Sequence, residues 1–254
     1  MDNHFIVTPY FIDQEAPNLY SFVQDGWQVN TVALPEGDPQ DKASAVHKPL
    51  ADIVEAACKS SKRPISVAGD CCATIPVMAG LQRAGLEPTF LWLDAHGDFN
   101  TWETTPSGFL GGMPLAMIAG LGDLRMNEAV GLRPIPQEKI ILADGRDLDP
   151  GERKLVENSS ITHIETVDKL KEISSEGPVY IHFDTDILHL DDLSAVKYPA
   201  KGGPRLHELA DVFHHLRANL DIVAVSTTIG VWKEDSERVK EEEKTAWDLL
   251  GLLF

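Results

Sequence analysis

The chain has 254 residues and a formal charge of −18, with 43% hydrophobic and 24% charged residues. This composition is ordinary for a globular protein, and the negative charge argues against nucleic acid and anionic membranes as partners. No apolar run approaches the ~18 residues that a membrane span needs, and the first residues do not resemble a signal peptide. Three cysteines, two of them adjacent, form no disulfide framework, so we expect a cytoplasmic location.

Apolar runs typical of strands alternate with segments of helical periodicity. Strand-like runs lie at 5–12, 27–34, 64–68, 90–93, 139–144, 161–164, 179–183 and 222–226. Helices are expected at 43–59, 73–84, 167–173 and 206–220, and two more are expected to begin near 113 and near 152. The charge-rich segment 237–244 predicts a solvated helix. An apolar tail at 247–254 should pack on the body or meet a neighbouring subunit.

This alternation predicts an α/β protein whose mostly parallel sheet is covered by helices on both faces, in three layers. Folds of this class and size are routinely single domains, so we expect one domain over residues 1–254. Such sheets bind ligands at the carboxyl ends of their strands.

The first group of candidate site residues follows the apolar run at 90–93. Asp94, His96 and Asp98 alternate along the chain, and in an extended backbone alternate side chains share a face. Two carboxylates and an imidazole suit Mn, Fe, Co or Zn. The alternative interpretation is a polar loop with three solvated side chains.

A second segment, 179–186, repeats the pattern and places Asp184 and Asp186 after an apolar run. Two strands that end in paired acids can bring four carboxylates to one edge of a sheet. So many negative charges together are tolerated only when cations neutralise them, which favours two metal ions over one.

Asp-Ala-His-x-Asp followed by His-Phe-Asp-x-Asp resembles the ureohydrolases of the arginase family, which include arginase, agmatinase, formimidoylglutamase and hydroxyarginine hydrolase; the resemblance runs over about residues 64–230. It implies an arginase-like fold, a homo-oligomer, and hydrolysis of a C–N bond in a small guanidino, amidino or related linear amide-like substrate by metal-bound hydroxide. It also implies two Mn²⁺ ions, held by Asp94, His96, Asp98, Asp184 and Asp186. Asp94 and Asp184 would bridge the ions, and we assign catalytic roles to Asp98 and Asp184.

The sequence departs from the family pattern at Cys71, which stands where the family has a metal-ligand histidine. A thiolate is softer than imidazole, and metal binding would ionise it. We interpret Cys71 as a metal ligand, which would also admit Zn²⁺, Fe²⁺ or Co²⁺. The alternative is that Cys71 fills core space and leaves one metal weakly held.

The same resemblance implies substrate-binding roles for Asn100, Ser107, Asp149 and Glu152. Asp149 and Glu152 match residues that face the α-amino group of arginine. The alternative is that Asp149 is a turn residue and Glu152 an acid at a helix start.

Two further departures concern the chemistry. Gly111 replaces a proton-carrying histidine, and Ala224 replaces a glutamate that binds the guanidinium, so a substrate other than L-arginine is indicated. His182 and His189 are candidate replacement proton carriers, although a lone histidine is more often structural. A non-catalytic binding or regulatory relative is the alternative function.

Overall fold

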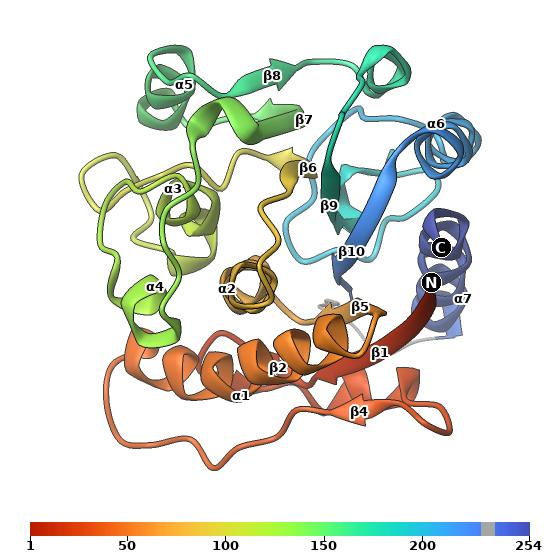
Figure 1. The fold of residues 1–254 in the computed structure, drawn as a ribbon. Helices are drawn as coiled ribbons and strands as arrows, with labels where there is room; N and C mark the ends of the chain where they lie inside the picture. The colour runs from red at the N-terminus through yellow and green to blue at the C-terminus, as the bar shows by residue number, and fades with distance from the viewer. Residues whose placement is uncertain (230–236) are drawn as a thin grey trace.

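The computed structural model describes residues 1–229 and 237–254 and is built around one eight-stranded sheet (Figure 1). The strand order is β4-β1-β5-β10-β9-β6-β7-β8, and every neighbouring pair runs parallel. The strands are β1 (Asp2–Thr8), β4 (Gln28–Val29), β5 (Lys62–Ala68), β6 (Thr89–His96), β7 (Ile140–Asp147), β8 (Thr162–Ile164), β9 (Pro178–Asp184) and β10 (Asp221–Thr228). A separate antiparallel pair joins β2 (Tyr10–Phe11) to β3 (Gln14–Glu15). The predicted parallel α/β class is confirmed.

Helices cover both faces of the sheet, so the predicted three layers are confirmed (Figure 1). The first face carries α1 (Pro39–Lys59), α2 (Thr74–Arg83), α3 (Pro114–Ile118), α4 (Arg125–Val130) and α5 (Pro150–Glu157). The second face carries α6 (Leu206–Asn219) and α7 (Glu237–Leu250). Short 3-10 turns connect the elements: η1 (Pro17–Phe22), η2 (Cys71–Ala73), η3 (Leu110–Gly112), η4 (Gln137–Lys139), η5 (Val167–Glu172), η6 (Thr185–Ile187) and η7 (Gly251–Leu253).

Helix α1 begins four residues earlier than its apolar periodicity predicts, because a capping box sets its start. Asp38 accepts a hydrogen bond from the Asp41 amide at 3.0 Å, and Asp41 accepts one from the Asp38 amide at 3.3 Å. Pro39 at the first helical position suits this start. The helix then packs closely on α2, where a Cβ at Gly80 would lie 2.6 Å from Val54 Cβ.

The apolar tail packs against the body of the protein, one of the two predicted placements. The ring centroids of Trp27 and Trp247 lie 5.2 Å apart, and those of Phe5 and Phe254 lie 5.7 Å apart. The prediction of a solvated charged helix is wrong at Glu242, which is 8% exposed and accepts hydrogen bonds from two amides of the loop 191–204. Within the two described ranges, no helix has both the length and the apolar character to cross a membrane.

The order of the strands places the chain's polar motifs side by side. Strands β5, β10, β9, β6 and β7 are consecutive neighbours, and since all run parallel, their carboxyl ends share one edge. The last residues of β6 and β9 and the segments that follow β5, β6, β7 and β9 carry the ten predicted metal-binding, catalytic and substrate-binding residues.

Candidate metal centre

The first motif lies at the end of β6 and leaves the extended conformation before its last acid. Asp94 and His96 belong to β6, but the register with β7 shifts between them, and Asp98 lies beyond the strand with a φ of 47°. The expected extended backbone therefore ends before Asp98, but the three side chains still converge, since ligand atoms of both His96 and Asp98 lie within 4.8 Å of one of Asp94. Two bonds orient the Asp94 carboxylate: the His96 amide donates at 2.7 Å, and the indole Nε1 of Trp92 donates at 3.1 Å.

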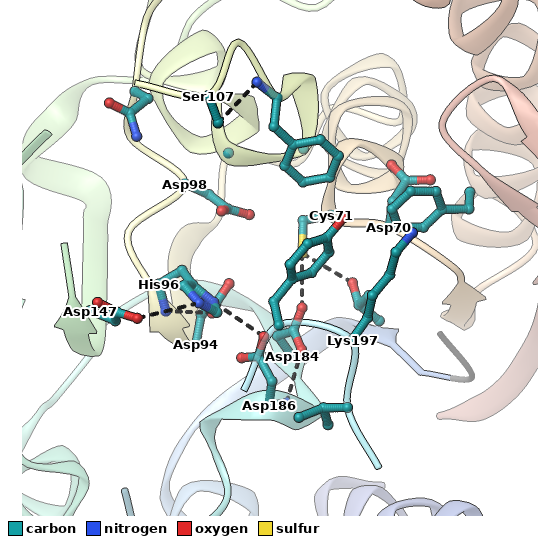
Figure 2. Close-up of a pocket in the computed structure, with 18 of the residues that line it drawn as sticks. Asp70, Cys71, Asp94, His96, Asp98, Ser107, Asp147, Asp184, Asp186 and Lys197 are labelled. Carbon is teal, nitrogen blue, oxygen red and sulfur yellow. Dashed lines mark hydrogen bonds and ion pairs between the residues drawn. The ribbon is translucent and has the colours of Figure 1, made fainter. Parts of the chain in front are cut away.

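The motif after β9 completes the cluster. Asp184 accepts a hydrogen bond from the Asp186 amide at 3.0 Å, and Asp186 Oδ2 lies 3.1 Å from His96 Nδ1. Ligand atoms of Asp94, His96 and Asp186 all lie within 4.8 Å of one another, as do those of Cys71, Asp94 and Asp98. These two groups share Asp94, and Figure 2 shows their labelled residues together with Asp184 around one centre.

Cys71 begins η2, directly after β5, and its thiol points into this cluster (Figure 2). Its Sγ donates to Asp184 Oδ2 at 3.1 Å and lies 3.2 Å from Thr228 Oγ1. The preceding turn is held by Asp70, which accepts hydrogen bonds from the amides of Ile12 at 2.6 Å and Cys72 at 2.9 Å. The structure therefore places Cys71 among the acids.

Burial and mutual repulsion raise the pKa of three of the acids, whereas at Asp94 the hydrogen bond and charge of His96 outweigh burial and lower the pKa. Burial raises the pKa of Asp98 well above its ordinary value, and the charge of Asp94 adds to this effect. Burial likewise raises the pKa of Asp184, together with the charge of Asp186. The pKa of Asp186 rises to about 6, first through burial and then through Asp94. Asp186 Oδ1 is buried without a hydrogen-bond partner in the described structure.

The same negative charges also raise the pKa of Cys71 and His96. Burial raises the pKa of the Cys71 thiol, and the Asp184 charge raises it further. Burial alone would lower the pKa of His96, but its hydrogen bonds to Asp186 and Asp94 outweigh burial and raise it. Crowded carboxylates with an imidazole and a thiol, on the wall of one pocket, form a donor set that fits divalent cations.

The four predicted substrate-binding residues line the same pocket but differ in whether their polar atoms are already hydrogen-bonded within the protein. Glu152 is 3% exposed, and its carboxylate accepts hydrogen bonds from the amides of Phe99 at 2.8 Å and Asp149 at 3.0 Å. Asn100 donates to Asp149 Oδ2 at 3.0 Å, whereas Ser107 is exposed in the outer part of the pocket. Burial raises the pKa of Glu152 to about 7. Both Glu152 oxygens thus bind backbone.

Neither departure from the family pattern leaves an open space at its position. A Cβ at Gly111 would lie 2.4 Å from Phe109 Cε1, so the Phe109 ring occupies the space of a side chain there. Ala224 is fully buried in the sheet beside Tyr180, and Thr228, four residues later, lines the pocket.

The predicted replacement proton carriers lie outside the pocket wall. His182 is 1% exposed and lies within β9, two residues before Asp184. His189 lies in the following loop, where its Nδ1 is 3.6 Å from Asp191 Oδ2.

The pocket wall also carries an aromatic group with a lysine, which the sequence did not predict. Lys197 Nζ lies 3.8 Å from the ring centroid of Phe11, and the rings of Phe109 and Tyr198 are 5.2 Å apart. Figure 2 shows Lys197 on the opposite side of the cluster from His96. The only signal in the sequence was the irregular loop after the second motif, because loops that carry binding residues lack periodicity.

Comparison with known proteins gives consistent matches along most of the chain. The model of the Arginase family matches residues 12–239. The N(omega)-hydroxy-L-arginine amidinohydrolase of Streptomyces lavendulae is 28% identical over 261 residues, which cover 100% of this chain and 87% of that protein. The arginase of Bacillus caldovelox is 32% identical over 217 residues, covering 81% and 73% of the two chains. The Bacillus cereus arginase structure has the same fold, with a TM-score of 0.84 and 24% identity. The match covers 100% of this chain and 98% of that one.

Proposed function

Because this chain belongs to the arginase family and is a hydrolase of the ureohydrolase type that acts on non-peptide C–N bonds, we propose that it cleaves a guanidino, amidino or related linear amide-like group with two divalent metal ions. The observation that carries this proposal is the pair of ligand groups that share Asp94 at the carboxyl edge of the sheet. The non-catalytic alternative is not favoured, because the similar proteins are named as enzymes.

Each ligand group would hold one ion. Cys71, Asp94 and Asp98 would hold the first, and Asp94, His96 and Asp186 the second. When bound, the ions would lower the pKa of a water molecule and so supply the nucleophile. Asp184, which contacts Cys71 and the Asp186 amide, extends toward both groups, and we assign it the second bridging role.

Asp98 and Asp184 are the proposed catalytic carboxylates. Both are more than nine-tenths buried and face the centre of the cluster, where a proton leaving the attacking water can be accepted at a carboxylate oxygen (Figure 2). Trp92 and the His96 amide keep the Asp94 carboxylate in a fixed orientation while this proton moves.

The outer pocket favours a substrate with polar groups away from the scissile bond. Asn100, Ser107 and Asp149 offer amide, hydroxyl and carboxylate groups, and Lys197 offers a positive charge. An amino-acid-like end, with an ammonium and a carboxylate, matches these groups. Glu152 supports this wall from behind through its two backbone hydrogen bonds.

The first ion's identity depends on Cys71. Manganese is the family's expected metal, but a thiolate ligand also suits Zn²⁺, Fe²⁺ or Co²⁺. We therefore propose two Mn²⁺ ions as the starting hypothesis, with the other three ions as alternatives at the site of Cys71.

The decisive experiment combines metal content with a substrate panel. The protein is loaded separately with Mn²⁺, Fe²⁺, Co²⁺ or Zn²⁺, and release of urea or ammonia is measured over guanidino, amidino and formimino compounds. Asp184→Ala should lose both metal and turnover. Asp147→Ala is the matched control, because Asp147 lies in the same pocket but is 65% exposed and 4.0 Å from His96 Nε2. Full metal content in Asp184→Ala would contradict the proposal.

Three broader expectations accompany this function. We propose that residues 1–254 form a single domain, that the protein is a homo-oligomer, and that it acts in the cytoplasm. Light scattering coupled to gel filtration tests the second, and a monomer at micromolar concentration would contradict it.

A further inference from the structure

His182 is a buried histidine with one ring nitrogen unused. It lies on β9, two residues before Asp184, and is 1% exposed. Its Nδ1 lies 2.9 Å from Ser226 Oγ, whereas Nε2 has no hydrogen-bond partner in the described structure. A buried polar atom without a partner is destabilising, and such atoms are rare enough in native proteins to require an explanation.

The surroundings of this histidine supply the explanation. One ring nitrogen of His182, Cys71 Sγ and a carboxylate oxygen of Asp184 all lie within 4.8 Å of one another. Cys71 therefore belongs to two groups, one with Asp94 and Asp98 and one with His182 and Asp184. His96 is committed to Asp94 and Asp186, so the imidazole near Cys71 is that of His182.

The ring is also held as a metal-ligating imidazole usually is. Ser226 Oγ lies 2.6 Å from the hydroxyl of Tyr180, so a hydrogen-bonded series runs from Tyr180 through Ser226 to His182 Nδ1. When Nδ1 carries the proton and donates it to Ser226, the lone pair lies on Nε2, the tautomer that binds a metal. The ring of Trp92, 4.3 Å away between centroids, packs against the imidazole and limits its rotation.

The competing interpretation is a core histidine satisfied by Ser226 alone. That interpretation leaves Nε2 without a function next to a buried thiol and carboxylate.

Building on the proposed function, we propose that His182 supplies Nε2 to the metal ion held by Cys71. A thiolate thus stands at the position of the family's imidazole, and the imidazole of His182 comes instead from β9, beyond the intervening β10. A site of thiolate, imidazole and carboxylates favours a borderline divalent ion such as Zn²⁺ or Co²⁺ over Mn²⁺.

The test compares two buried histidines. His182→Phe keeps a ring against Trp92 but removes the nitrogen. His47→Phe is the matched control, since His47 is 3% exposed, also has an unpartnered ring nitrogen, and lies in α1. Metal content by mass spectrometry and affinity by calorimetry are measured with Zn²⁺, Co²⁺ and Mn²⁺. We expect His182→Phe to bind one ion at least about 10-fold more weakly, and His47→Phe to match wild type.

A measurement on the unmodified protein keeps the proposal testable if His182→Phe does not fold. X-ray absorption of the fully Co²⁺-loaded wild type counts imidazole rings by their outer-shell scattering. Two rings per two ions support the proposal, and one ring overturns it. Where His182→Phe does fold, the thiolate-to-cobalt absorption band of Cys71 should shift in the Co²⁺-loaded variant, and an unchanged spectrum with unchanged affinity would overturn the proposal.

The two levels of inference fail in different ways. If wild type binds two ions and His182→Phe binds both with wild-type affinity, His182 is structural and the proposed function stands. If wild type binds no divalent ion tightly, or if Asp184→Ala keeps its full metal content, the proposed function itself fails.

Discussion

The thiol of Cys71 donates a hydrogen bond to Asp184, with 3.1 Å between Sγ and Oδ2. This contact joins the segment after β5 to the end of β9 across the intervening β10. Without a metal the proton stays on sulfur, because burial and the charge of Asp184 both raise the pKa of the thiol. A metal at Cys71 must displace that proton, because the thiolate is the ligand form.

The first prediction is that metal binding at Cys71 releases a proton that Cys71→Ser does not release. Calorimetric titration with Zn²⁺ in buffers of different ionisation enthalpy at pH 7 gives the number of protons. We expect Cys71→Ser to release about one fewer proton than wild type and to bind Zn²⁺ more weakly relative to Mn²⁺. Equal proton release in both proteins would show that the thiol stays outside the coordination sphere.

The second prediction separates Glu152 from Asp149. Glu152→Gln should lower the free energy of unfolding by roughly 1–3 kcal/mol, because an amide cannot accept both the Phe99 and Asp149 hydrogen bonds. Asp149→Asn should leave stability within about 0.5 kcal/mol of wild type but raise KM roughly 10-fold for a substrate with an ammonium group. Urea melts and steady-state kinetics measure the two effects. A large change in kcat alone for Asp149→Asn would argue against a binding role.

The third prediction concerns Lys197. Lys197→Met keeps an aliphatic stem against Phe11 but removes the charge. For the best substrate of the panel, kcat/KM should fall about two- to fivefold if that substrate carries a carboxylate, since the lysine is exposed and its pairing is weakened by water. The analogue without the carboxylate should be unaffected. Equal losses for both compounds would assign Lys197 a role in shaping the pocket.

The arrangement of the ligand residues was predictable because two simple rules apply to it. Apolar runs followed by Asp94 and by Asp184 identify strands, and parallel strands bring their carboxyl ends to one edge. The division of His96 and Asp98 between two groups was not predictable, since it depends on a register shift in β6 and on the left-handed backbone of Asp98. A non-glycine residue with positive φ has no reliable sequence signal.

Contacts between distant segments set the remaining features. Lys197 lies in a loop without periodicity, whose Ser194 and Ala195 amides are held by Glu242 of α7. The charge pattern predicts a solvated helix face at Glu242, and the loop has no periodicity. The contact between them therefore could not be inferred from the sequence. The early start of α1 is different, because Asp38, Pro39 and Asp41 form a local capping pattern that is visible in the sequence itself.

The fourth prediction is that restoring the family's glutamate will not restore arginine hydrolysis. Ala224 is 0% exposed within the sheet, so the carboxylate of Ala224→Glu would enter the core beside Tyr180. An uncompensated buried charge costs roughly 3–5 kcal/mol, and we expect a destabilised protein without new activity. Ala224→Ser is the control for a small polar change. A stable Ala224→Glu protein that hydrolyses L-arginine faster than wild type would show that this position reaches the pocket.

The fifth prediction is a pH dependence of stability that originates in α1, away from the site. Burial lowers the pKa of His47 to about 3 from its ordinary value of 6.5. Between these values the unfolded chain binds a proton that the folded protein does not, so stability falls as the pH drops below about 6.5. The slope for one proton is at most about 1.4 kcal/mol per pH unit.

His47→Phe removes this titration. Between pH 7 and pH 5 the variant should therefore lose about 2 kcal/mol less stability than wild type. Urea melts at both pH values, with a chelator in every sample, measure the difference. Any pH dependence of stability that originates at His182 cancels, because both proteins contain this residue. If the two proteins lose equal stability on acidification, His47 is protonated in the folded state, and burial does not exclude its charge.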